Sequence, residues 1–275
     1  MKRTFFFMLG LSFSALAALG SGVGDHAQAA EDQTPASQTG ARPITLTILY
    51  DNYALQKGLK TGHGFSCLIQ GTEKAVLFDT GADGETLFAN FAALKLDPRD
   101  VDLVVISHPH ADHTGGLLAF LAKRGACQVF LPASASPDLI KQVQAAKGQT
   151  VLVKDPLSVC EGVFSTGPIM DEQALAVDTP QGLVILTGCA HPGIVEVVEK
   201  AKSVMPKEIY LVMGGFHLIG RLPAEVELIS RRLRELGVKN LGASHCTGDK
   251  AIAQFKKDFG KNYIPLGVGK EIAIR

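Results

Sequence analysis

Apolar residues recur along this chain with two periods, one typical of strands and one typical of helices. Early in the chain, apolar runs and alternation predict three strands, at residues 44–50, 64–69 and 75–79. Helical spacing follows over residues 85–94, and a continuous apolar run predicts a buried strand at 103–107. The first part of the folded chain is therefore expected to be built on a sheet.

Shorter elements are expected in the middle of the chain. A helix should follow the buried strand at once, and the pattern then predicts a strand at 128–131 and a helix at 137–146. Two further strands are predicted at 150–153 and 160–164, and residues 174–188 are typical of a hairpin.

In the last third, a predicted strand ends near a histidine three times, and a predicted helix follows each time. These histidines are His191, His217 and His245, and His108 follows the strand at 103–107 in the same way. Ligands of layered α/β folds collect at the carboxyl ends of strands, so the four histidines are expected to meet. Strands first, then alternating strands and helices in a doubled pattern, predict a four-layer αββα sandwich.

Residues 1–29 have the pattern of a secretory signal peptide. Two basic residues precede an apolar run at 5–19, and a small-residue cleavage site ends at Ala29. The run is shorter than the roughly 20 residues that span a bilayer. We expect a flexible leader over 30–42, one domain over 43–275, and a periplasmic or secreted protein without a stable membrane anchor after cleavage.

Charge and cysteine content narrow the function. The chain has 27 Lys and Arg against 27 Asp and Glu, which disfavours a protein built to bind nucleic acid and favours a small-molecule substrate. Five cysteines cannot all be paired in an oxidising compartment, so at least one is a thiol or a ligand. Cys189 and Cys246 lie next to histidines and are the cysteines of interest.

The densest chemistry is the segment H-P-H-A-D-H at residues 108–113. Neutral imidazole nitrogens and carboxylates are ligands of divalent cations such as zinc. Three histidines and an aspartate in six positions can serve two ions, provided that distant residues complete the coordination.

The signature H-x-H-x-D-H, after Val-Ile-Ser and before Thr-Gly-Gly, resembles that of the metallo-β-lactamase-fold hydrolases. Residues 78–81, Phe-Asp-Thr-Gly, resemble the early aspartate motif of that family. The segments GHGFSCLI, TGCAHPGI, MGGFHL and SHCTG are similar to the branch of the dihydropterin–aminobenzene-phosphate synthases.

The resemblance implies a set of metal ligands. His108 and His110 would hold a first ion, while Asp112 and His113 would hold a second that His245 completes.

Two positions depart from the common pattern of the family. The Gly-His segment that often supplies the third ligand of the first ion is Ser-Thr-Gly-Pro here, at 165–168, and His191 is the candidate replacement. Where the family has a bridging aspartate after Thr-Gly, this chain has Cys189, which is either a thiolate ligand or a buried thiol.

Other residues are assigned roles around the metals. With Asp112 orienting the nucleophile, His217 is the candidate catalytic and substrate-facing residue, the alternative being a packed side chain. His63 lies in a loop that resembles a rim element of the branch and is a candidate for substrate binding. Asp79 is expected to orient a ligand histidine, and Cys246 is expected to point away from the site if the strand geometry continues past His245.

Together these features predict an exported binuclear hydrolase in which metal-bound hydroxide attacks an ester, phosphoester or related bond. Zinc is the favoured ion, with manganese or iron as alternatives. Helix N-termini after Gly193 and Gly248 favour an anionic group on the substrate. The alternatives are a transferase like the synthases of the branch, against which the signal peptide counts, and a non-catalytic metal-binding module.

Overall fold

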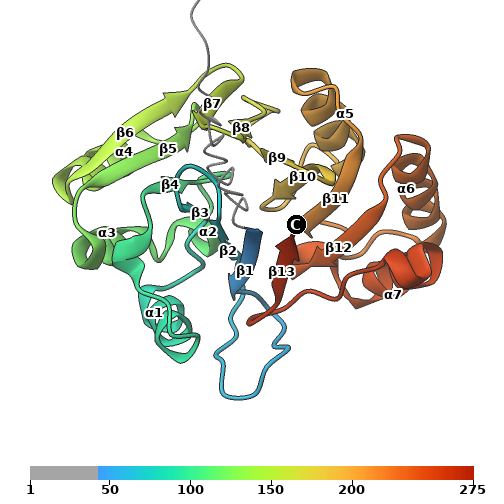
Figure 1. The fold of residues 1–275 in the computed structure, drawn as a ribbon, viewed down its shortest axis with the longest axis horizontal. Coiled ribbons are helices and arrows are strands. Elements are labelled where there is room, and N and C mark those ends of the chain that lie inside the picture. The colour runs from blue at the N-terminus through green and yellow to red at the C-terminus, as the bar shows by residue number, and fades with distance from the viewer. Residues whose placement is uncertain (1–42) are drawn as a thin grey trace, which may run out of the picture. The chain divides into compact units, whose positions relative to one another are not determined.

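Two β-sheets lie face to face in the computed structural model, which describes residues 43–275 (Figure 1). The first sheet has the strand order β13-β1-β2-β3-β4-β5-β6, and the second has the order β12-β11-β10-β9-β8-β7. The strands of the first are β1 (Ile44–Tyr50), β2 (Ser66–Gln70), β3 (Val76–Phe78), β4 (Leu103–Val105), β5 (Cys127–Pro132), β6 (Gly148–Val153) and β13 (Glu271–Ile274). Those of the second are β7 (Leu157–Cys160), β8 (Val163–Ser165), β9 (Leu175–Thr179), β10 (Gly182–Thr187), β11 (Ile209–Gly215) and β12 (Asn240–Ser244). The predicted signal peptide and leader lie outside the described residues.

Helices cover the outer face of each sheet (Figure 1). Those outside the first sheet are α1 (Gly84–Ala93), α3 (Leu117–Arg124) and α4 (Pro137–Ala145), and those outside the second are α5 (Ile194–Val204), α6 (Pro223–Glu235) and α7 (Asp249–Phe259). The short α2 (Ala111–Thr114) lies in the loop after β4. Three hydrophobic clusters result, one between the sheets and one under each helical layer, so the predicted αββα sandwich is confirmed.

The sequence pattern explains why these layers form. In α5 the buried residues Ile194, Val197, Val198 and Ala201 recur at the spacing that places them on one helical face. Buried strands of the second sheet, such as β10, are apolar on both faces because one face packs on β-sheet and the other on helices.

Most predicted elements are found within one or two residues of their expected bounds. The strand predicted at 160–164 is wrong, because the chain turns at Glu161 and Gly162 and joins β7 to β8 as an antiparallel hairpin. Gly162 adopts a φ of 77°, which glycine allows at little cost. Within residues 43–275, no helix is long and apolar enough to span a membrane.

Candidate metal centre

The candidate site lies where the carboxyl ends of strands from both sheets meet. His108 and α2 follow β4 of the first sheet, and His191, His217 and His245 follow β10, β11 and β12 of the second. Parallel pairing of β10 with β11 and of β11 with β12 places these three strand ends side by side. The expected meeting of the four histidines is therefore confirmed.

Backbone strain is concentrated at these strand ends. Asp79, Ala190, His217 and His245 all have positive φ, between 49° and 58°, although none is glycine. Such conformations cost of order 1 kcal/mol or more and persist where surrounding structure enforces them, often at functional sites. Each turn lies at, or directly before, a polar residue of the site, since His191 follows Ala190.

Close packing also fixes the loop that carries the histidine motif. A Cβ added at Gly115, just after α2, would lie 1.9 Å from the backbone oxygen of Ala82. Only glycine allows this approach, so the Gly that follows the motif holds α2 against the loop after β3.

All seven histidines within residues 43–275 form one continuous cluster of rings. His108 lies at the centre, with its ring centroid 4.1 Å from that of His113, 4.5 Å from His110 and 4.9 Å from His191. The remaining contacts join His191 to His217 at 4.3 Å, His110 to His191 at 5.0 Å, His113 to His245 at 5.1 Å and His63 to His245 at 4.9 Å. Every histidine with a predicted role at the site is thus part of this cluster.

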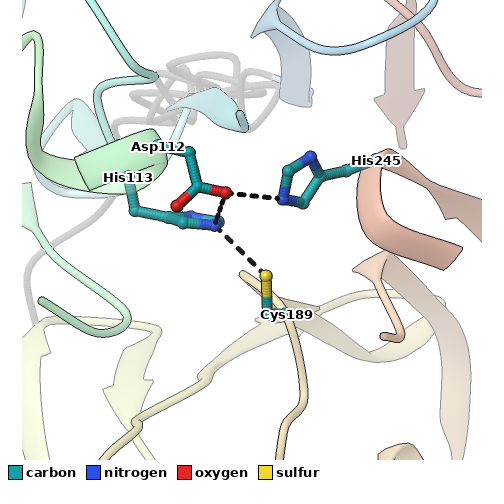
Figure 2. A group of neighbouring side chains, drawn as sticks. All are labelled: Asp112, His113, Cys189 and His245. Carbon is teal, nitrogen blue, oxygen red and sulfur yellow. Dashed lines mark hydrogen bonds and ion pairs between the residues drawn. The ribbon is translucent and has the colours of Figure 1, made fainter. Parts of the chain in front are cut away.

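Four side chains form the first potential metal-binding group, shown in Figure 2: Asp112, His113, Cys189 and His245. Asp112 Oδ2 lies 3.3 Å from His245 Nε2 and 3.5 Å from His113 Nε2. Cys189 Sγ lies 3.3 Å from the same nitrogen of His113. One ligand atom of each lies within 4.8 Å of all the others, a spacing that a single divalent ion can bridge.

A second group consists of His108, Cys189 and His191, again with ligand atoms within 4.8 Å of one another. His110 is outside this group, although its ring packs against both histidines. Cys189 belongs to both groups, so its sulfur lies between the two potential metal positions, at the place where the sequence resemblance implies a bridging ligand.

Unpartnered nitrogens show that the donor set fits a cation. His108 Nε2 and His245 Nε2 are buried and make no hydrogen bond, although Asp112 Oδ2 lies 3.3 Å from the His245 nitrogen. Buried polar atoms rarely remain unpaired, and an ion is one of the accepted explanations. Imidazoles, a thiol and a carboxylate are also the ligand types that zinc takes, so the residues present fit such an ion.

The electrostatics of the cluster favour the same interpretation. Burial and the neighbouring His113 and His110 lower the pKa of His108, which keeps it in the neutral form that binds metals. Burial also lowers the pKa of His113, but the charges of Asp79 and Asp112 outweigh burial and raise it to about 10. The two carboxylates therefore favour a positive charge at this ring, and an ion bound at His113 Nε2 would displace the proton held there.

Asp79 supports the site from beneath. Its Oδ2 accepts hydrogen bonds from His113 Nδ1 and from Ser107 Oγ, each at 2.7 Å, and its Oδ1 accepts one from Ser107 N at 2.7 Å. The bond to Nδ1 orients the His113 ring so that Nε2 faces Asp112 and Cys189. This is the geometry that the expected role of Asp79 requires.

Cys246 does not point away from the site, so that prediction is wrong. Residues 245–247 form a 3-10 turn directly after β12, and the alternation of a strand therefore stops before Cys246. Its Sγ lies 3.3 Å from Cys189 Sγ and belongs with Cys189 and His217 to a third group of close donor atoms. The hydrogen bond with Cys246 and burial raise the pKa of the Cys189 thiol, so formation of its thiolate calls for a nearby cation.

Two site residues were missed by sequence reasoning. Glu172 is buried, and its Oε1 accepts hydrogen bonds from both the backbone N and the ring Nδ1 of His191. Asn52 Oδ1 lies 2.9 Å from His245 Nδ1. Both hold a ring nitrogen of a candidate ligand, but they stand in loops without a motif, so no spacing in the sequence indicates them.

The candidate substrate-facing residues lie at the edge of the cluster. His217 is exposed, and burial of part of its ring together with the nearby His191 lowers its pKa. His63 is exposed as well, with Nε2 3.3 Å from Asp112 Oδ2. A cavity of about 270 Å³ also opens at the cluster, and its lining includes His108, His110, Glu172 and His191.

Comparison with known proteins adds a family likeness to this geometry. Residues 59–137 match the model of the family described as the metallo-beta-lactamase superfamily. A relative from Methanocaldococcus jannaschii, 7,8-dihydropterin-6-methyl-4-(beta-D-ribofuranosyl)-aminobenzene-5'-phosphate synthase, is 30% identical over 83% of this chain and 96% of its own length.

Solved structures have the same architecture. One described as a metal-dependent hydrolase of the beta-lactamase superfamily is 28% identical, with a TM-score of 0.71 over 83% of this chain and 98% of that one. Zinc-bound PqqB from Methylobacterium extorquens is 10% identical, with a TM-score of 0.55 over 83% of this chain and 99% of that one, a likeness of fold alone.

Proposed function

Because the chain belongs to the metallo-beta-lactamase superfamily, we propose that it is a hydrolase that uses two divalent ions, with zinc as the favoured metal. The observation that supports this most is the pair of donor groups that share Cys189, one with Asp112, His113 and His245 and the other with His108 and His191. His110, whose ring packs against those of His108 and His191, is the candidate that would complete the second group.

The metals would supply Lewis acidity, which polarises an ester or phosphoester oxygen and lowers the pKa of water towards neutrality. The protein residues would supply position. Asp112 Oδ2 faces the candidate ligands His113 and His245 and the exposed His63, so it can orient a water molecule as a hydrogen-bond acceptor. Burial raises the pKa of this carboxyl, but the neighbouring His113 and His245 outweigh burial and hold the pKa well below its usual range, so it stays ionised. The buried His108 and Asp79 hold these groups in place and exclude bulk water beneath them.

His217 would act on the substrate. Its ring stands 4.3 Å from that of His191 but is exposed, so it faces the space above the cluster. A lowered pKa keeps this imidazole neutral at pH 7, the form in which it donates one hydrogen bond to an oxygen of the substrate. We propose this role for the leaving-group side of the reaction.

The test is turnover by metal-loaded protein of four model substrate classes: a phosphodiester, a lactone, a thioester and the lactam nitrocefin. Turnover of at least one, abolished in His108→Ala and reduced about 10²-fold in Asp112→Asn, supports the hydrolase. Equal rates in His108→Ala and wild type, or no turnover of any class by fully loaded protein, would contradict it.

A transferase is the second candidate, because the relative from M. jannaschii is named as a synthase. That reaction would join an amine or carbon nucleophile to the substrate in place of water. Product analysis separates the two, since incubation with an arylamine acceptor gives a coupled product from a transferase and only the hydrolysis product from a hydrolase.

Export belongs to the proposal as well, on the evidence of the basic residues, apolar run and Ala-Gln-Ala site of residues 1–29. Expression of the full chain in a bacterium should give a periplasmic protein that begins at Ala30, as measured by intact mass. A cytoplasmic protein of full-length mass would contradict export.

A further inference from the structure

A groove of about 510 Å³ lies between α5 and α6 and reaches the histidine cluster, because His191 and His217 line it. It is larger than the 270 Å³ cavity on the other side of His191. The volume is within the roughly 300–1,000 Å³ typical of small-molecule sites. A molecule held at the cluster can therefore extend into it.

The lining of the groove is mainly apolar. It includes Pro192, Ile194, Val195, Leu218, Leu228 and Ile229. Leu228 is 58% exposed, and the nearby Ile219 and Leu222 are also exposed large apolar residues. One such residue needs no explanation, but three within ten positions beside a groove form a patch that favours contact with an apolar molecule.

Three of the four charged residues that line the groove, Arg221, Glu225 and Arg232, take part in ion pairs, and the fourth is Glu196. Arg221 Nη1 donates to Glu225 Oε1 at 3.2 Å. Arg232 donates to Glu199 at 3.0 Å and to Glu235 at 3.2 Å. Two arginines and two glutamates line the groove, so their formal charges cancel and no net charge selects a charged ligand.

We infer that the substrate carries an uncharged apolar arm, an alkyl or aryl group, that lies in the α5–α6 groove while the bond under attack lies at the histidine cluster. This inference rests on the proposed function, since it places the reacting end at the metals. A small molecule is favoured over a protein partner because the groove ends at the reaction site and has the volume of a small-molecule site.

The test uses n-alkanehydroxamates of increasing chain length, whose head group binds divalent ions. Calorimetric titration of the zinc-loaded full chain should show the Kd falling about fourfold for each added methylene, the gain expected for burial of a CH₂ group. The Kd should stop falling once the alkyl chain is longer than the groove.

Leu228→Gln should flatten this dependence and leave the Kd of acetohydroxamate unchanged, because the side chain is exposed and lies away from the ligand atoms. Leu118→Gln is the matched control, since Leu118 is 37% exposed on α3 outside the other sheet, and it should keep the wild-type slope. Sedimentation of each variant shows its oligomeric state.

Three results would overturn the inference. If acetohydroxamate binds but longer chains bind no better, the groove holds no apolar arm while the metal centre stands. If Leu228→Gln converts a dimer into a monomer, the groove faces a second copy of the chain. If no hydroxamate binds, the proposed metal centre fails and the inference fails with it.

Discussion

The Asp79 carboxylate offers the sharpest test of how the site is held together. It accepts three hydrogen bonds of 2.7 Å, and one of them fixes the ring of His113. In Asp79→Asn the amide keeps one carbonyl oxygen for Ser107 N, while its NH₂ group faces His113 Nδ1. The backbone tolerates this change, because Asn, like Asp, adopts the positive φ of 58° found there.

The Ser107 hydroxyl can turn to accept a hydrogen bond from the new NH₂ group, so the expected loss is the charge-assisted hydrogen bond to His113, or about 1.5–3 kcal/mol. This agrees with the roughly 10–100-fold loss of metal affinity that follows removal of a residue orienting a ligand. We expect zinc affinity to fall by that factor, as measured by competition with a chromogenic chelator, and the urea midpoint of the metal-free protein to fall as well.

Asp83→Asn is the matched control. Asp83 caps α1 by accepting a hydrogen bond from Thr86 N, and asparagine caps equally well. Its zinc affinity should equal that of the wild type. Unchanged zinc affinity in Asp79→Asn, with unchanged stability, would refute the role given to Asp79.

Three further outcomes are expected. In cobalt-loaded protein, Cys189→Ser should remove the sulfur-to-cobalt charge-transfer absorption and Cys246→Ser should retain most of it; the reverse would make Cys246 the ligand. Gly115→Ala should reduce both metal content and stability, because its Cβ would collide with the Ala82 oxygen, and wild-type values in both would contradict the packing described. Phe120→Ala should lower the free energy of unfolding by about 3–5 kcal/mol in urea titration, since the ring is fully buried; a loss below 1 kcal/mol would contradict that burial.

The layers and the place of the site could be predicted from the sequence because two strong signals agree. Apolar periodicity separates strands from helices, as in α5, whose buried face follows helical spacing. Histidines placed directly after predicted strands then put the chemistry at one edge, since parallel strands end side by side. The fold and the clustering of His108, His191, His217 and His245 both follow from this.

The features that the sequence pattern did not predict lie in turns and loops, where hydrophobic periodicity carries no information. Cys246 enters the site because the chain tightens into a 3-10 turn at His245, and this reverses the side expected from strand alternation. Glu172 reaches His191 from a loop between β8 and β9. The apolar residues on both sides of the two-residue turn at Glu161 and Gly162 predict one continuous strand, where the chain instead forms a hairpin.

Metal content per chain is the most direct test of the central proposal. Elemental mass spectrometry of protein purified without chelator should give about two zinc ions per chain, as two donor groups require. The double variant His108→Ala/His113→Ala should lose both ions, with thermal unfolding measured to show that it is folded. A metal-free wild-type protein that also refuses added zinc would contradict the account, since the cluster would then hold no metal.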